Sequence, residues 1–246
     1  VKDADGNSGV WTSDKTFRNL PYMIQSAEGK PVNSFYLIKT DGIFQSDEEA
    51  ANYKNAKGER IQPEAQAGDL KFVDYNGDGK ISDDDRQYMG NAMPKTTFAF
   101  TLGMTWKKLS VSAMFLGKSM ILSDVEGSFN RSAEILNAWS PTNTGSGIPR
   151  LSKLDNNKNF TRPSDYFLEN SSYLRFKNFT VSYDLSDVFR KWAHMNERNS
   201  RLSVYFSGEN LATFTGYSGV DPECGGWDAL KYPVSRVLSV GVKLTY

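Results

Sequence analysis

The residues with the clearest chemical potential lie in one acidic stretch, "DYNGDGKISDDD", at positions 74–85. Calcium takes about six to eight oxygen ligands, and a loop of about twelve residues can supply them. Such a loop carries Asp or Asn at positions 1, 3 and 5, Gly at position 6 and a carboxylate at position 12. Those positions are filled in order by Asp74, Asn76, Asp78, Gly79 and Asp85.

The remaining positions of the stretch fit the same pattern. Lys80 would offer its backbone carbonyl, Ile81 would be the apolar anchor, and Ser82 could act directly or through water. Asp85 occupies the position where Glu is usual. Because Asp is one methylene shorter, bidentate binding of the ion by this carboxylate requires the backbone to come closer. The alternative is a solvated acidic turn, because Asp, Asn and Gly favour turns. The expected calcium ligands are Asp74, Asn76, Asp78, the Lys80 carbonyl and Asp85.

The segments around this loop alternate apolar and polar residues with a period of two, which predicts β-strands. In "TTFAFTLGMTWKKLSVSAMFLG" two such runs are joined by Lys107 and Lys108, as in a β-hairpin. "YLRFKNFTVSYDL" changes phase near Asn178, which predicts a bulge. "RLSVYFSGENL" and "RVLSVGVKLTY" are two further strand candidates.

The fold class predicted from these runs is all-β and antiparallel, and the pattern favours a transmembrane barrel over a water-soluble sheet. Runs of about 9–12 residues suit tilted membrane strands. The turn at 106–109 is minimal, whereas 117–172 and 211–234 are expected to be long polar loops, and this asymmetry is typical of outer-membrane barrels. The residues expected to face lipid are Leu238, Val240, Val242, Leu244 and Tyr246. Those expected to face the interior are Ser239, Gly241, Lys243 and Thr245.

Composition narrows the classes of function. Lysine and arginine number 29 and aspartate and glutamate 29 in 246 residues, so nothing points to a nucleic-acid partner. The chain has one cysteine and one histidine, too few for most histidine-based triads and metal sites, and no carboxylate pair has a spacing typical of catalysis. We therefore do not expect an enzyme. Short helices are expected at 46–56, 132–139 and 186–193.

Several motifs in a fixed order carry a resemblance to a known family. "VNSFYLIKTDGIFQSDEEAANY" is followed by "AGDLKF" and the acidic loop, "GN" and "PK" before the hairpin, "ENL" in a later strand, and a terminal aromatic, Tyr246. This resembles the C-terminal part of the SusC/RagA family of TonB-dependent outer-membrane transporters over most of residues 33–246. "AGDLKF" replaces a proline-glycine form at the loop's lead-in.

The resemblance implies that residues 1–246 are a C-terminal segment, about seven or eight strands, of a large transmembrane β-barrel of about 22 strands in the cell outer membrane. The plug domain and the segment that contacts the TonB complex would lie outside these residues, in the missing N-terminal region. Such transporters import oligosaccharides or peptides with a SusD-like surface lipoprotein as a lid. The EF-hand-like loop at 74–85 would then lie within a long extracellular loop, where calcium would fix its conformation.

One alternative from another functional class stays open at this point. A soluble dockerin-like calcium-binding interaction module uses the same loop with Asp at position 12. Such modules need two copies and a helix after each loop, whereas this chain has one copy, preceded by the strand-like "GDLKFV".

Overall fold

The computed structural model describes residues 11–12, 23–119, 121–123, 135–193, 200–223 and 234–245. The chain divides into two compact units. The first unit comprises Val1–Met93, Ile121–Glu169 and Gly226–Ala229, and the second comprises Pro94–Met120, Asn170–Gly225 and Leu230–Tyr246.

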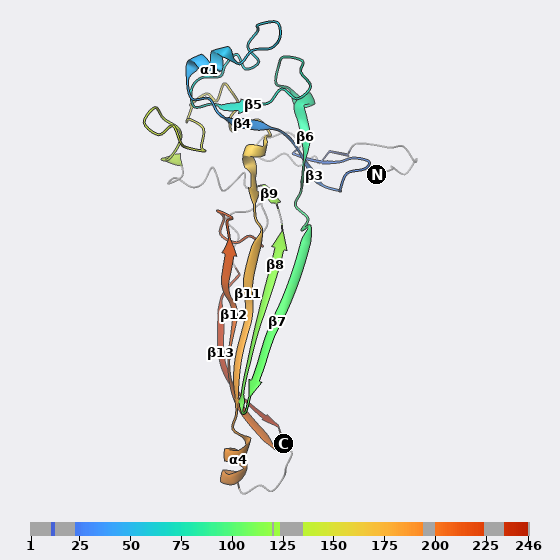
Figure 1. Cartoon of the computed structure of the whole chain (residues 1–246), viewed down its shortest axis with the longest axis vertical. Coiled ribbons are helices and arrows are strands. Elements are labelled where there is room, and N and C mark those ends of the chain that lie inside the picture. The colour runs from blue at the N-terminus through green and yellow to red at the C-terminus, as the bar shows by residue number, and fades with distance from the viewer. Residues whose placement is uncertain are drawn as a thin grey trace. The chain divides into compact units, whose positions relative to one another are not determined.

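The second unit is built on one antiparallel sheet of five strands in the order β13-β12-β11-β8-β7, which run side by side in Figure 1. The strands are β7 (Thr96–Trp106), β8 (Leu109–Ser119), β11 (Tyr173–Asp184), β12 (Arg201–Thr215) and β13 (Val237–Thr245). The predicted hairpin is confirmed: Trp106 pairs with Leu109, and Lys107 adopts a left-handed φ of 55° in the turn. The described part of this unit contains these five long strands.

Two irregularities interrupt this sheet. The register of β11 shifts between Phe176 and Asn178 against both neighbours, which confirms the predicted bulge. The predicted loop at 211–234 was wrong at its start, because β12 continues pairing with β11 as far as Thr215. Asn210 has a left-handed φ of 53°, so the alternation breaks there although the strand does not end.

Register sorts the side chains of this sheet onto two chemically different faces. Directly paired residues of antiparallel strands project to the same side. One row across all strands is apolar: Met104, Val111, Val181, Phe206 and Val240. A row on the opposite face is small and polar: Gly103, Ser112, Thr180, Ser207 and Ser239. The alternation seen in each run is therefore in phase across all five strands.

The apolar face of the sheet is exposed. Val240 is 82% exposed, and Leu102, Met104, Trp106 and Val242 are each more than half exposed. The buried hydrophobic side chains described in this unit are Tyr173 and Tyr217. Exposed apolar side chains that are contiguous across several strands mark a surface that contacts another apolar surface, of protein or of membrane.

The first unit, in contrast, has a packed core. It contains a four-stranded sheet in the order β1-β2-β3-β6 and the pair β4-β5, while β9 pairs with β10. Their bounds are β1 (Trp11–Thr12), β2 (Ile24–Ser26), β3 (Ser34–Ile38), β4 (Thr40–Ile43), β5 (Leu70–Phe72), β6 (Arg86–Asn91), β9 (Ile121–Ser123) and β10 (Leu168–Asn170). Core side chains are Phe35, Leu37, Ile38, Phe44, Ala50, Ala65, Leu70, Phe72 and Phe167.

Helices are short in both units. Helix α1 (Asp47–Asn52) begins after Ser46, whose hydroxyl accepts a hydrogen bond from the Glu49 amide as the sequence predicts. The 3-10 turns η1 (Asp83–Asp85) and η2 (Asp165–Phe167) lie in the first unit, and α4 (Ser186–Ala193) spans the predicted range in the second. The helix expected at 132–139 begins at residues outside the described part. None of the described helices combines the length and apolar content needed to cross a bilayer.

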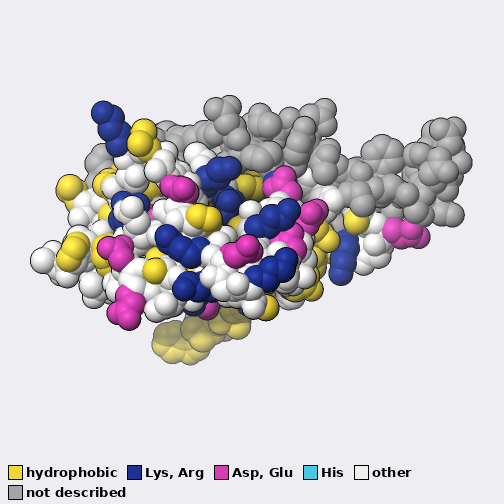
Figure 2. All heavy atoms as spheres, turned by 90° about the horizontal axis from the view of Figure 1, so that it is seen from above, with side chains coloured by type: hydrophobic (Ala, Val, Ile, Leu, Met, Phe, Trp, Pro, Cys, Tyr) yellow, Lys and Arg dark blue, Asp and Glu magenta, His cyan; other side chains and the backbone are white. Residues whose placement is uncertain are grey.

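Charged side chains of both signs are interspersed on the face of the molecule shown in Figure 2. This mixing matches the equal numbers of basic and acidic residues in the sequence.

Candidate functional site

The acidic loop at 74–85 follows β5 and leads through η1 into β6. Gly79, at position 6, has a φ of 89°, and a Cβ there would lie 2.4 Å from Asn55 Nδ2. Only glycine combines that backbone with that close approach. Ile81, at position 8, packs against the core of Ile38, Leu70 and Phe72. The turn and the apolar anchor predicted from the loop pattern are therefore both present.

The side-chain oxygens at positions 1, 3 and 5 hold the loop's own backbone. Asp74 accepts hydrogen bonds from the Gly77 amide (2.7 Å) and the Gly79 amide (2.8 Å). Asn76 Oδ1 accepts one from the Asp78 amide (2.9 Å), and Asp78 Oδ1 accepts one from the Lys80 amide (3.1 Å). A carboxylate has about four acceptor sites, so these bonds leave further capacity on each aspartate.

Asp85, at position 12, is fully buried and binds backbone amides with both oxygens. Its Oδ1 accepts hydrogen bonds from the amides of Tyr75 (2.8 Å) and Asn76 (3.3 Å), and its Oδ2 accepts one from the Ser82 amide (2.7 Å). Ser82 in turn accepts one from the Asp84 amide (3.2 Å), which completes a capping box at the start of η1. Asp85 thus closes the loop on itself from position 12 back to positions 2 and 3.

The structure does not gather the three expected aspartate ligands into one cluster. Within the described ranges, no three histidine, cysteine, aspartate or glutamate side chains converge where they could hold a metal ion. The Lys80 ammonium lies 3.7 Å from Asp78 Oδ2. Burial lowers the pKa of Arg162, and the negative charges of Asp83, Asp85 and Asp155 act against that shift. The Arg162 guanidinium therefore offsets part of the negative charge near Asp85, at position 12 of the loop.

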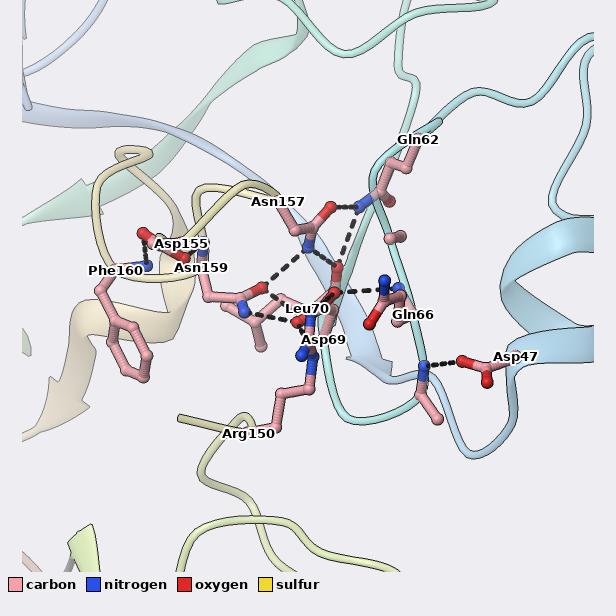
Figure 3. Close-up of polar contacts among 12 residues, drawn as sticks. Asp47, Gln62, Gln66, Asp69, Leu70, Arg150, Asp155, Asn157, Asn159 and Phe160 are labelled. Carbon is pink, nitrogen blue, oxygen red and sulfur yellow. Dashed lines mark hydrogen bonds and ion pairs between the residues drawn. The ribbon is translucent and has the colours of Figure 1, made fainter. Parts of the chain in front are cut away.

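A buried polar network, shown in Figure 3, centres on Asp69 just before β5. Arg150 binds the Asp69 carboxylate through two nitrogens, at 2.7 and 3.1 Å. Asn159 Nδ2 donates to Asp69 Oδ1 (2.8 Å), and the Gln66 amide donates to Asp69 Oδ2 (2.9 Å). A buried carboxylate is stabilised when it is paired and hydrogen-bonded in this way.

The same network binds both backbone polar groups of Leu70 in β5. Asn159 Oδ1 accepts from the Leu70 amide (2.9 Å), while the side-chain amides of Asn157 and Gln62 both donate to the Leu70 carbonyl (3.0 Å each). It therefore joins the segment before the acidic loop to residues 150–159, which lie 81 to 90 positions away in sequence. The sequence did not predict this network: of its members, Asp69 alone lies in a motif that carries the resemblance, "AGDLKF".

The polar face of the five-stranded sheet carries a pocket of about 440 Å³ in the second unit. Its lining residues are Lys108, Ser110, Ser182, Asp184, Ser186, Arg201, Leu202, Ser203, Lys243 and Thr245. Lys243 and Thr245 are two of the residues expected to face the interior. The residues expected to face lipid lie on the other face: Leu238, Val240, Val242 and Leu244 are exposed, and Tyr246 lies outside the described residues.

A buried charge cluster at the other end of β11 was also missed by sequence reasoning. Arg175 is 1% exposed, and its guanidinium binds Asp221 Oδ1 (2.6 Å) and Glu223 Oε2 (2.7 Å). Glu223 Oε1 accepts from the Tyr173 hydroxyl (2.5 Å) and lies 3.5 Å from Lys118 Nζ. The cluster fixes the segment after β12 against β8 and β11.

Hydrogen bonding also sets the ionisation of the two acids in this cluster. Burial alone would raise the pKa of Asp221, but hydrogen bonds from the Glu223 amide, Arg175 and the Val234 amide outweigh it and hold that pKa below its usual range. Burial would likewise raise the pKa of Glu223. The hydrogen bond from Tyr173 and the nearby charge of Arg175 lower it instead.

Comparisons with known proteins give a consistent result. No model of a known protein family matches the chain. TonB-dependent receptor P3 of Formosa agariphila is 28% identical over 239 residues, covering 89% of this chain and 22% of that protein. TonB-dependent receptor SusC of Bacteroides thetaiotaomicron is 27% identical over 182 residues, covering 71% of this chain and 17% of that protein. These homologues are receptors and transporters, not enzymes.

Solved structures share the fold. The RagAB peptide importer in its "open-open" state superposes with a TM-score of 0.71 at 22% identity, covering all of this chain and 25% of that one. The RagAB peptide transporter gives 0.68 at 25% identity and covers 97% of this chain and 25% of that one. The chain thus spans a quarter or less of these proteins. The resemblance predicted from the sequence is confirmed: the chain is a homologue of part of the TonB-dependent receptors that include SusC, and it has the antiparallel fold of RagA-type transporter barrels.

Proposed function

We propose that this chain forms part of the barrel wall of an outer-membrane TonB-dependent transporter that imports glycans or peptides. The observation that carries the proposal is the five-stranded sheet whose exposed apolar face and polar face are in register across every strand. In a transmembrane barrel the apolar side faces lipid and the polar side lines the interior. The homology to TonB-dependent receptors supports the same assignment.

The partners follow from the same proposal. A SusD-like or RagB-like surface lipoprotein would assist uptake, and the TonB complex would supply energy through a part of the transporter outside these residues. The relatives do not distinguish the two substrate classes, since SusC and the RagAB peptide importer are both similar to this chain. The described first unit would belong to the extracellular loops, where its packed core and the Asp69 network would give the loops a fixed shape.

Two measurements test the transporter. A strain that lacks the gene should lose uptake of one glycan or peptide fraction, and the intact gene should restore it. A protonophore that removes the TonB energy source should abolish uptake in the restored strain. Unchanged uptake in the deletion strain, across both substrate classes, would refute the proposal.

A label experiment tests the orientation of the wall. Nitroxides at Leu238, Val240, Val242 and Leu244 should be accessible to oxygen dissolved in the bilayer and protected from a water-soluble nickel reagent. Nitroxides at Ser239 and Lys243 serve as matched controls on the same strand and should show the reverse. The opposite pattern would mean that the faces are inverted.

Calcium binding at 74–85 is a second proposal for the loop, with Asp74, Asn76, Asp78, the Lys80 carbonyl and Asp85 as ligands. The left-handed Gly79, the partly buried Ile81 anchor and the oxygen-rich donor set support it. Of the five proposed ligands, Asp85 fits least well, because both of its carboxylate oxygens accept hydrogen bonds from backbone amides. The bound ion would supply positive charge among these carboxylates and stiffen the loop. The residues that follow the loop form β6, whereas the dockerin-like alternative requires a helix there.

A further inference from the structure

Two residues at the start of β11 project to the polar face of the sheet. Phe98, Leu174 and Phe214 lie in one row of the apolar face, through their pairing across β7, β8, β11 and β12. The neighbours of Leu174 on β11, Tyr173 and Arg175, therefore point to the opposite side, because successive strand residues alternate between the two faces. The side chains that bind Tyr173 and Arg175 lie over the polar face as well.

The acids that bind these residues belong to the segment 216–223, which follows β12 and which we call the strap. Asp221 Oδ1 lies 2.6 Å from Arg175 Nη2, and Glu223 Oε2 lies 2.7 Å from Arg175 Nη1. Glu223 Oε1 also lies 3.5 Å from Lys118 Nζ on β8. In the sheet order β8 is two strands from β12, a separation of roughly 10 Å. The strap therefore extends over the polar face across β11 and toward β8.

Further hydrogen bonds attach the strap near both of its ends. The Thr215 hydroxyl donates to the Ser172 carbonyl (2.9 Å), and its oxygen accepts from the Tyr217 amide (3.1 Å). The Val234 amide donates to Asp221 Oδ2 (3.2 Å). Tyr217 is 7% exposed and Asp221 8% exposed, so parts of the strap are themselves buried. The strap is a packed segment of the second unit.

The strap lies at the end of the sheet opposite the minimal turn. Strand β8 begins after the turn at Lys107 and Lys108 and ends at Ser119, so Lys118 is its next-to-last residue. In the proposed barrel this end carries the long loops, and the polar face of the sheet encloses the interior. A segment bound to the polar face at this end would lie inside the mouth of the barrel.

We infer that the strap narrows this mouth and limits the size of the solutes that reach the interior, and that the buried ion pairs of Arg175 hold it in the inward position. The inference rests on the proposed transmembrane role of the sheet. The alternation of the strands predicts a wall with two faces, whereas the ion pairs add a segment folded against the inner face.

The test measures which reagents pass the strap in the complete receptor, in the outer membrane of intact cells. All native cysteines, including Cys224, are replaced by serine, and Glu209→Cys supplies the single thiol. Glu209 is exposed and lies two residues from Ser207, on the same polar face and further from the mouth than Arg175. A small charged maleimide added outside the cells should label this thiol. A maleimide carrying a long polyethylene glycol chain should label it much more slowly.

Loosening the strap should admit the larger reagent. Asp221→Asn together with Glu223→Gln keeps the shape of both side chains but removes the charges that bind Arg175. Because hydrogen bonds between charged groups are lost, labelling by the large maleimide should accelerate about tenfold, and labelling by the small one should change little. If the double variant does not assemble, Glu223→Gln alone leaves Asp221 paired with Arg175 and should give a smaller acceleration.

Asp187→Asn is the matched control for the loss of an ion pair. Asp187 lies 2.8 Å from Lys108 Nζ, at the opposite end of the same sheet. This variant should leave both labelling rates unchanged. Heat-dependent migration in detergent gels shows whether each variant has assembled.

Each outcome separates the inference from the transporter proposal. Equally fast labelling by both reagents in the otherwise unmodified receptor overturns the inference, and so does a large-reagent rate that stays the same when the strap is loosened. Failure of both reagents in every variant would mean that another part of the receptor closes this mouth, which also overturns it. Val240→Cys on the apolar face tests the wall itself. If it reacts with the small charged maleimide as fast as Val220→Cys on the exposed part of the strap, the transmembrane sheet is refuted.

Discussion

Arg175 Nη2 lies 2.6 Å from Asp221 Oδ1, and both side chains are nearly inaccessible to solvent. A strand residue and a loop residue 46 positions away thus form a buried ion pair on the polar side of an otherwise open sheet. Removing one partner of such a pair leaves an uncompensated buried charge, which costs more than the pair itself contributes.

Replacing Arg175 should therefore destabilise the second unit strongly. We expect Arg175→Met to lower the free energy of unfolding of the complete receptor by about 3–5 kcal/mol. Urea unfolding in detergent micelles measures this. Arg201→Met is the matched control, because Arg201 is an exposed strand arginine and its loss should cost less than about 1 kcal/mol. A loss of similar size in both variants would contradict the buried-pair account.

The same cluster should give the receptor an acid-sensitive loop. The pKa values of Asp221 and Glu223 are lowered in the folded state. Their stabilisation is present above their ordinary pKa values, near 4, and is lost as the pH falls through the lowered folded values. Protease cleavage of the 216–223 segment should thus stay slow from neutral pH down to about pH 4 and accelerate only below it. Cleavage that accelerates between pH 6 and 7 would show that other groups control the loop.

Calcium should bind the acidic loop and protect it from proteolysis. Asp78→Ala removes one expected ligand and the hydrogen bond to the Lys80 amide, so it should abolish the calcium-dependent protection. Asp41→Ala is a matched control, because Asp41 is exposed and lies outside the loop. Isothermal titration of the two variants with calcium measures the difference directly. Equal heats from both would mean that 74–85 is a self-capped turn.

Asp69 should be essential for the shape of the first unit. Asp69→Asn keeps the size of the side chain but removes the charge paired with Arg150, and we expect it to lower the stability of this unit by about 3 kcal/mol. Hydrogen exchange of the Leu70 and Phe72 amides reports on the network locally. Asp47→Asn, which retains an acceptor for the Ala67 amide at an exposed site, should leave exchange at β5 unchanged. Equal protection in both variants would show that apolar packing alone holds β5.

Some features of this protein follow from the sequence alone, because they depend on neighbouring residues. Alternation with a period of two located the β7–β8 hairpin, the phase change predicted the bulge at Asn178, and Ser46 predicted the start of α1. In each case the physical cause lies within a few residues: strand pleating, a local extra residue, or a hydroxyl that caps nearby amides.

The features that only the tertiary structure decided depend on residues far apart in the chain. Register across five strands determined that every alternating run is in phase, and a one-residue slip in any pair would have mixed the two faces. Asp69 with Arg150, and Arg175 with Asp221, are partners 81 and 46 positions apart. The spacing of residues in the sequence does not predict such pairs. A buried charge is stabilised by any oppositely charged side chain that the fold brings next to it, whatever the sequence separation. Asp85 is a further example. Its position in the loop predicts a calcium ligand, whereas in the structure both of its carboxylate oxygens accept hydrogen bonds from backbone amides.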